Sequence, residues 1–438
     1  MKIINHYRNI FLSFIFIILM GFNINSQTLT LAEAKTLVII NNYGIVIKQY
    51  ERDISQLQNH PGYAGMLPVI SAIAMYNTEL SNTEQLYFNG DTRSEQNAGS
   101  TLFDAGVYLN YTIFDGLAMF ATKQRLEELE ALGELYLKQE IEATLFNLSA
   151  SWYQLIQLQN AFSVIDSAIK ISNERYIIAK SRENIGSGSG LDVLQALVDM
   201  NTDSSVYFNL ELQIKNIKAE INNIVGRDPF IKFTTSEKID MDKSIILEQV
   251  ITASATNNFN ILIAQKNERI VALQIKEFKS FLFPTLNLTA GYGYLKSTSE
   301  AGFVESNLSY GPSIGLTLNI PLFNGFTAGK NIETAKISQQ ISVTQTNSLK
   351  SDMNTHILTV YNQYQTSLYL IDLEKRNVEA AKRNVEIALE KFNVGSMISI
   401  ELREIQQNQI DAENRLLLET LNAKLAELEL KRLSGLLY

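Results

Sequence analysis

Cysteine is absent from this chain of 438 residues, and histidine occurs only three times. Without cysteine the protein has no disulfide bond, no thiolate nucleophile and no lipid-modified N-terminal cysteine. His6 lies in a segment that we expect to be removed, which leaves His60 and His356. Two histidines are too few for a histidine-rich metal site, so the sequence predicts no bound metal.

A nucleotide-binding motif is also missing. The segment 186–190 is rich in glycine and serine, but Leu191 and Asp192 follow where a phosphate-binding loop needs lysine and a hydroxyl residue. We therefore interpret 186–190 as a tight turn between two helices. Since the chain also has no cysteine and no histidine cluster, we predict no catalytic residue and no cofactor, and an enzyme is the least favoured class of function.

Residues 1–26 have the pattern of a secretory signal peptide. Lys2 and Arg8 provide positive charge, an apolar run covers 10–20, and a polar stretch covers 23–26. The apolar run is shorter than the ~20 residues that a membrane-spanning helix requires, and no later stretch qualifies. An uncleaved membrane anchor is the alternative interpretation.

The chain is acidic, with a formal net charge of −9 that becomes −11 if the first 26 residues are removed. This charge argues against a nucleic-acid partner, because a surface that binds nucleic acid neutralises phosphates with lysine and arginine. We interpret this negative charge instead as the lining of an acidic pore.

The chain also matches itself at a nearly fixed distance. The offset is 216 positions up to Pro68 and 209 positions from Gly106 onward. A repeat of this length indicates a duplicated domain rather than a solenoid unit of ~20–50 residues. We predict a first structural repeat at 27–228, a linker at 229–243 and a second repeat at 244–438. The matched pairs include Asn41 with Asn257, Asn42 with Asn258, Pro68 with Pro284, Phe114 with Phe323, Gly116 with Gly325, Asn184 with Asn393, Gly186 with Gly395, and Gly226 with Gly435.

Two segments in each repeat alternate apolar residues with small or polar ones. The alternation is clearest over 313–322, where isoleucine and leucine occupy every second position. A period of two is typical of half-buried strands. Segments of about ten residues suit tilted membrane-spanning strands, whereas a soluble β-sandwich is the alternative. The strands that we predict cover about 68–80, 103–115, 284–296 and 311–323.

Long helices surround these strands in the sequence. We predict a first helix over about 30–65 and its counterpart over 244–283. Between Gly116 and Asn184 there is no proline, and apolar residues around Trp152 have heptad-like spacing. At 1.5 Å per residue such a helix is ~100 Å long. Each repeat is therefore predicted to contribute long, parallel helical rods.

Four strands per chain are too few for a closed membrane barrel. Such barrels need at least ~8 strands, because an open edge in lipid leaves backbone groups unpaired. Copies of the chain must therefore combine. Two copies would supply eight strands and three copies would supply twelve.

The signal peptide, the duplicated helix-strand-strand-helix-helix plan and two short motifs resemble those of the TolC-type outer-membrane efflux proteins, also called outer membrane factors. The resemblance covers nearly all of the mature chain. The motifs are the segment 318–325 (Leu-Asn-Ile-Pro-Leu-Phe-Asn-Gly) and the turn and helix start at 190–196. Thr112 departs from the pattern where the second repeat has Pro321. The strand-to-helix motif comprises Phe114, Asp115 and Gly116 in the first repeat, and Pro321, Phe323, Asn324 and Gly325 in the second.

The resemblance implies a mainly α-helical fold with a membrane β-barrel. It further implies a homotrimer that shares a 12-stranded β-barrel in the outer membrane and a long α-helical barrel in the periplasm. The partners it implies are a periplasmic adaptor protein, an inner-membrane transporter and outer-membrane lipid.

The same resemblance marks two helix-to-helix turns as the tips that meet the adaptor. Ser189 and Asp192 also have capping-box spacing, and Glu401 holds the matching place in the second repeat. The tip residues are Gly186, Ser189 and Asp192 in the first repeat, and Gly395, Ser396 and Glu401 in the second.

Charged residues near the tips are candidates for a gate. A threefold axis would turn any inward-facing acid into a ring that favours cations. The alternative is a solvated helix face, where isolated ion pairs contribute only ~0–1 kcal/mol. The candidates are Glu183, Glu379, Arg383, Glu386 and Glu390.

The function that these features favour is a passive outer-membrane exit duct, driven by an inner-membrane partner. It would serve a tripartite efflux pump or a type I secretion system, and carry small molecules or polypeptide. The alternative class is a non-conducting envelope protein that uses long coiled-coil helices as a spacer.

Overall fold

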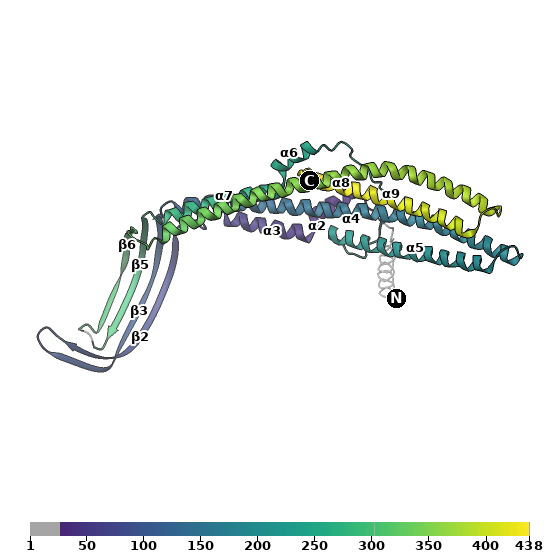
Figure 1. Cartoon of the computed structure of the whole chain (residues 1–438). Coiled ribbons are helices and arrows are strands. Elements are labelled where there is room, and N and C mark those ends of the chain that lie inside the picture. Colours follow the sequence, from purple (N-terminus) through teal and green to yellow (C-terminus); the bar gives the residue numbers. More distant parts are fainter. Residues whose placement is uncertain (1–26, 302, 438) are drawn as a thin grey trace, which may run out of the picture. The chain divides into compact units, whose positions relative to one another are not determined.

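The computed structural model describes residues 27–301 and 303–437 (Figure 1). The predicted signal peptide, residues 1–26, lies outside the described residues. The order helix, helix, strand, strand, long helix, helix occurs twice along the chain. The elements are β1 (Gln27–Thr28), α2 (Leu31–Asn41), α3 (Tyr43–Gln58), β2 (Val69–Leu86), β3 (Thr92–Phe114), α4 (Ala118–Asn184), α5 (Gly190–Val225), β4 (Phe233–Thr234), α6 (Leu247–Asn257), α7 (Phe259–Ser280), β5 (Thr285–Ser299), β6 (Ser306–Asn319), α8 (Thr327–Asn393) and α9 (Ser399–Leu433).

The chain forms two compact units, and each unit takes segments from both halves of the sequence. The sheet unit comprises 48–139 and 259–352, and the helical unit comprises the described residues up to 47, 140–258 and 353 onward. The prediction of a very long helix is confirmed, since α4 and α8 each have 67 residues and run through both units. None of the helices in the described part of the chain is long and apolar enough to cross a membrane.

The sheet unit contains a four-stranded antiparallel sheet in the order β2-β3-β5-β6 (Figure 1). The strands are longer than predicted, with 18, 23, 15 and 14 residues. The prediction ended β2 at residue 80 because the apolar alternation stops there. The backbone pairing continues through polar residues, past a register shift between Ser81 and Thr83. β6 ends at Asn319, not at 323, because Pro321 has no N–H to donate to a partner strand.

The two faces of this sheet differ in side-chain size. On one face Leu109 pairs with Ala290, which pairs with Ile314. On the other face the ring of Tyr108 lies over glycines. A Cβ atom on Gly291 would lie 2.6 Å from a Tyr108 ring atom, and one on Gly106 would lie 2.8 Å away. The alternation of apolar with small residues in the sequence therefore reflects an apolar face and a face where glycines accommodate an aromatic ring.

Each predicted first helix is broken into two by an asparagine, which corrects the predictions over 30–65 and 244–283. Asn42 separates α2 from α3, and Asn258 separates α6 from α7, both with extended backbone. The Oδ1 atom of Asn42 accepts a bond from the Ile45 N–H at 3.1 Å, which caps the start of α3. Its Nδ2 atom donates to the Ile224 carbonyl at 2.8 Å.

The second half of the chain repeats this junction. Asn258 Nδ2 donates to the Leu433 carbonyl at 3.1 Å. Each junction is completed by a glycine, which follows α5 in the first half and α9 in the second. Gly226, at φ 73°, would place a Cβ atom 2.4 Å from the Asn41 carbonyl oxygen, and Gly435, at φ 68°, would place one 2.8 Å from that of Asn257. Both glycines have left-handed backbone and lie against a neighbouring backbone, so only glycine fits.

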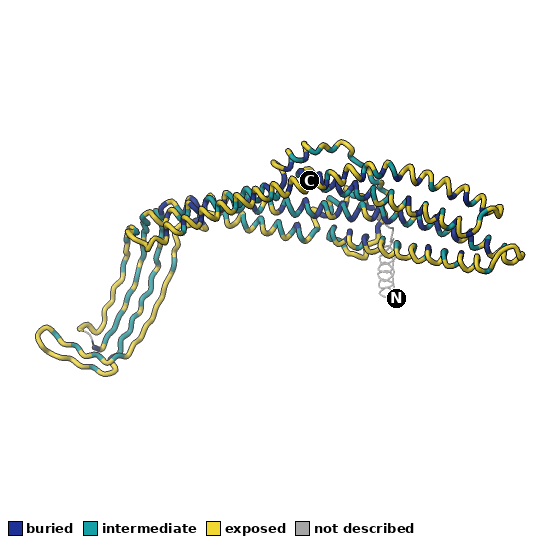
Figure 2. The backbone as a smooth tube through the Cα atoms, viewed as in Figure 1, coloured by how far each residue is buried: buried dark blue, intermediate teal, exposed yellow. Residues whose placement is uncertain are grey.

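The core of the helical unit surrounds Trp152 on α4. Of the predicted heptad positions, Leu145, Leu148, Trp152 and Leu155 are buried, whereas Phe162 and Ile169 are half-buried. Buried residues recur along the helices of this unit (Figure 2). The predicted linker at 229–243 packs onto this core. Phe233 stacks on Trp152 with ring centroids 5.9 Å apart, and Trp152 Nε1 donates to the Glu237 carboxylate at 2.6 Å.

Candidate functional site

The two long helical hairpins of the helical unit end in turns of the same geometry. The N–H groups of Gly186 and Gly395 each bond to the carbonyl three residues earlier, at 3.0 Å. The N–H groups of Ser187 and Ser396 each bond to the carbonyl five residues earlier, at 2.9 Å. Gly186 has φ 74° and Gly395 has φ 80°. These bonds form the glycine-containing C-terminal cap that ends many helices.

The predicted tip residues lie in these two exposed turns. Ser189 Oγ accepts a bond from the Leu191 N–H at 3.1 Å, and the Glu401 carboxylate accepts one from the Ile398 N–H at 3.3 Å. Asp192 lies in the first turn of α5, where a carboxylate stabilises the positive end of the helix. The structure therefore brings each predicted set together in one turn.

A buried polar cluster that sequence reasoning missed joins the two hairpins. Asp203 on α5 is only 3% exposed, and its carboxylate accepts two bonds from Arg403 on α9, at 2.7 and 2.8 Å. Ser172 on α4 donates to the same carboxylate at 2.6 Å. Gln406 Nε2 on α9 donates to the Ala168 carbonyl at 2.8 Å. We name Ser172, Asp203, Arg403 and Gln406 the polar latch.

Asp203 stabilises the charged form of Arg403 in the latch. Burial by itself disfavours the charged guanidinium, but the hydrogen bonds that Arg403 donates to Asp203 and the charges of Asp203 and Asp199 outweigh burial and raise the pKa of Arg403. Removing one partner of such a buried ion pair is strongly destabilising, because the remaining charge stays in a poorly solvated site. The latch therefore resists separation of the two hairpins.

The profile of the family described as "Outer membrane efflux protein" matches residues 58–227 and 250–436, which is well over half of the chain. The chain belongs to the outer membrane efflux protein family. Members of this family reside in the outer membrane, so this protein is located there and extends into the periplasm.

Relatives of known name support this assignment. The chain is 20% identical over 308 residues to the outer membrane efflux protein BepC of Brucella suis biovar 1 (strain 1330). That match covers 70% of this chain and 66% of BepC, just under two thirds of its length. The chain is 19% identical over 405 residues to the outer membrane protein TolC of Salmonella enteritidis, covering 91% of this chain and 80% of TolC. These relatives are named as outer membrane proteins and not as enzymes.

The fold is similar to that of a solved outer membrane protein, VceC of Vibrio cholerae. The TM-score is 0.74 at 15% sequence identity, and the similarity covers 92% of this chain and 96% of VceC. The resemblance to outer membrane factors that the motifs indicated is therefore confirmed at the level of family and fold.

The charges predicted as a gate in this efflux-family protein are exposed in the single chain. Arg383 and Glu386 form an ion pair at 2.9 Å, but both residues belong to α8, so the pair does not join the two hairpins. Glu183, Glu379 and Glu390 are also exposed. Their role as a gate stays a prediction, whereas the polar latch is a buried cluster with charged members that connects the hairpins.

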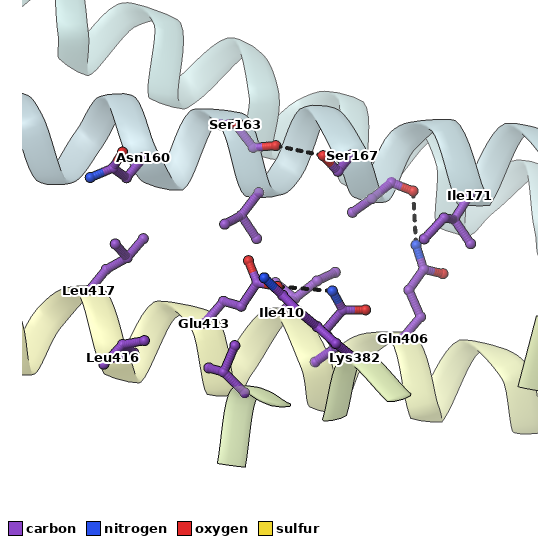
Figure 3. Close-up of a pocket in the computed structure, with 14 residues that line it drawn as sticks. Asn160, Ser163, Ser167, Ile171, Lys382, Gln406, Ile410, Glu413, Leu416 and Leu417 are labelled. Carbon is purple, nitrogen blue, oxygen red and sulfur yellow. Dashed lines mark hydrogen bonds and ion pairs between the residues drawn. The ribbon is translucent and has the colours of Figure 1, made fainter. Parts of the chain in front are cut away.

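A groove of about 490 Å³ lies beside the latch, between α4, α8 and α9 (Figure 3). Lys382 and Glu413 form an ion pair across it at 3.3 Å, and Gln406 of the latch lines it as well. Within 27–301 and 303–437, no group of three or more histidine, aspartate or glutamate side chains could hold a metal ion. Hydrogen bonds, an ion pair and helix packing connect the residues of the latch and of this groove.

Proposed function

We propose that this protein is the outer-membrane exit duct of a tripartite efflux pump or a type I secretion system. The duct is passive, and an inner-membrane transporter drives export through a periplasmic adaptor. The observation that carries the proposal is the four-stranded sheet, in which β2 and β6 each pair along one edge only within the described residues. An edge of this length cannot face lipid unpaired.

Closure by further copies of the chain satisfies both edges. All neighbouring strands are antiparallel, so β2 and β6 run in opposite directions. The β6 edge of one copy is therefore able to pair with the β2 edge of the next as an ordinary antiparallel neighbour. Three copies give the 12-stranded barrel and the homotrimer of the efflux family, with the apolar face toward outer-membrane lipid.

Exposed apolar stripes on the helices support the same assembly. In the sheet unit Tyr50, Ile54 and Leu57 follow one another at steps of four and three along α3, and all are exposed. In the helical unit Leu191, Leu194 and Val198 follow one another at steps of three and four along α5, and all are exposed. Steps of three and four are the pattern by which helices pack in coiled coils. Copies that cover these stripes would form a helical barrel.

Purified protein is expected to form pores. In detergent it should run as a trimer that dissociates on heating, and in planar lipid bilayers it should conduct ions. A water-soluble monomer without pore activity would instead favour the non-conducting spacer, and would reject the duct.

The polar latch is expected to hold the helical barrel closed. Asp203→Asn leaves Arg403 without its charge partner, and a loss of about 2 kcal/mol from the closed state raises the open population about 30-fold. The measurement is the open fraction of single channels in planar bilayers. The control is Asp166→Asn on α4, which removes a surface ion pair between Asp166 and Lys170 of that helix.

The same recordings test the gate that was predicted from sequence. If Glu386→Gln or Glu390→Gln changes ion selectivity while Asp203→Asn leaves the open fraction at the native value, the exposed acids and not the latch control conductance. Unchanged conductance and selectivity in the glutamate variants removes those residues from the gate.

A further inference from the structure

Arg182 connects the two tips of the helical unit. It lies in the last turn of α4, and its Nη2 atom donates a hydrogen bond to the Phe392 carbonyl near the end of α8. Its guanidinium also lies over the Phe392 ring, 4.8 Å from the centroid. The same carbonyl accepts the N–H of Gly395 in the second turn. One side chain from the first tip therefore binds the backbone and the ring on which the second tip is built.

The surroundings hold both partners of this contact in place. Phe392 is 2% exposed and packs with Ala388 and Leu402. Gly188 lies against the Arg182 side chain, because a Cβ atom on Gly188 would be 2.8 Å from the Arg182 Cβ. The first turn thus folds over the stem of Arg182, and Met397 of the second turn packs against the cluster that contains Phe392.

The contact departs from the sequence repeat. At the offset of 209 the equivalent of Arg182 is Lys391, and the equivalent of Phe392 is Glu183. The backbone bonds of the two turns are nevertheless the same. Duplication accounts for two equal turns, whereas the link between them uses the positions at which the repeats differ.

Arginine suits this position for two physical reasons. The last carbonyls of a helix lack partners within the helix and carry partial negative charge, which a cation stabilises. The planar guanidinium is able to donate to a carbonyl and stack on an aromatic ring at the same time. The residue therefore caps α8 from another helix.

We propose that Arg182 is a positioning residue that sets the spacing between the two tips, so that one partner surface meets both glycine turns together. The inference rests on the proposed function, in which these turns bind a periplasmic adaptor. Such a partner would pack small side chains closely against the backbone at Gly186 and Gly395, and it would need the two turns at a fixed distance.

The absence of cysteine makes the spacing measurable. Ile185→Cys and Val394→Cys add one thiol to each turn at equivalent, exposed positions. Spin labels on these thiols report the distance between the tips in the purified trimer without any partner. Arg182→Met removes the donor and the charge. Lys180→Met is the control, because the Lys180 ammonium lies over the Tyr176 ring of its own helix, 5.8 Å from the centroid.

We expect Arg182→Met to reduce the narrow, native distance population about tenfold, which corresponds to about 1.4 kcal/mol, with the melting temperature of the trimer unchanged. Lys180→Met should keep the native distribution. Ethidium accumulation and released protein, measured in cells that carry each variant or no copy of the gene, distinguish failure of the positioning role from failure of the proposed function. If native cells and cells without the gene accumulate ethidium alike and release the same proteins into the medium, the proposed function fails. If Arg182→Met keeps the native distance distribution in the trimer, the positioning role is overturned.

Discussion

Gly395→Leu is expected to reduce transport at least about 100-fold while trimers still reach the outer membrane. The side chain would have room, since the nearest atom to a Cβ at this position is Arg182 Nη2 at 3.9 Å. The left-handed backbone at φ 80° costs leucine only about 1–2 kcal/mol. The fold therefore tolerates the change, but the new side chain projects from the turn that we propose to bind the adaptor. Gly186→Leu should behave alike, since no atom lies within 4 Å of its Cβ position.

Transport is measured as ethidium accumulation in cells and as protein released into the culture medium, and trimers are measured by electrophoresis without heating. Gly90→Leu is the matched control. Gly90 also has a positive φ, of 91°, and no atom within 4 Å of its Cβ position, but it lies in the turn between β2 and β3. Equal losses in Gly90→Leu and Gly395→Leu would assign the effect to backbone strain. Native transport in Gly395→Leu would refute the assignment of the tips.

Glu142→Gln is expected to raise the free energy of unfolding by about 3 kcal/mol at pH 8 and by much less at pH 5. Glu142 on α4 is 4% exposed, and its Oε1 atom has no hydrogen-bond partner among the described residues. Burial raises the pKa of its carboxyl group to about 7. Arg432 opposes this rise and Glu429 adds to it.

The sign follows from the two pKa values. The carboxyl group binds its proton more tightly in the folded protein than in the unfolded chain, where the pKa is 4.5. Its contribution to stability is therefore complete below pH 4.5, is lost as the pH rises to about 7, and stays lost above that. Glutamine is neutral at every pH and removes this loss.

The measurement is chemical denaturation of the purified protein in detergent at pH 5 and pH 8. His356 contacts Glu429 at 2.9 Å, so the quantity to compare is the difference between variant and native protein at each pH. Glu174→Gln, an exposed substitution on the same helix, is the control. A difference that is the same at both pH values would contradict the prediction.

The parts of this fold that could be predicted from the sequence are those whose interacting residues lie close together along the chain. The uninterrupted helices α4 and α8 and the alternating strands arise from local patterns, which is why they were predicted. The break at Asn42 was not, because an asparagine in an amphipathic helix resembles any surface polar residue. The carbonyl that it binds belongs to Ile224, 182 positions away.

The site shows the same limit. The two turns were predicted because each carries its own glycine and cap residues, and their assignment as tips comes from the family resemblance. The polar latch was missed because Asp203 and Arg403 are 200 positions apart, and each resembles one charge on a solvated helix face. Arg182 was missed for a related reason, since its partner Phe392 lies 210 positions away. A sequence repeat directs attention to positions that match, whereas both of these links use positions that do not.

The equal lengths of α4 and α8 restrict which insertions and deletions these two helices tolerate. Inserting one residue into a helix rotates everything beyond it by about 100° and advances it by about 1.5 Å, so the buried positions of α8 would face solvent. Seven residues restore the phase to within about 20°. Insertions and deletions in the 67-residue helices are therefore compatible with packing at lengths close to a whole number of turns, such as seven residues, introduced in α4 and α8 together.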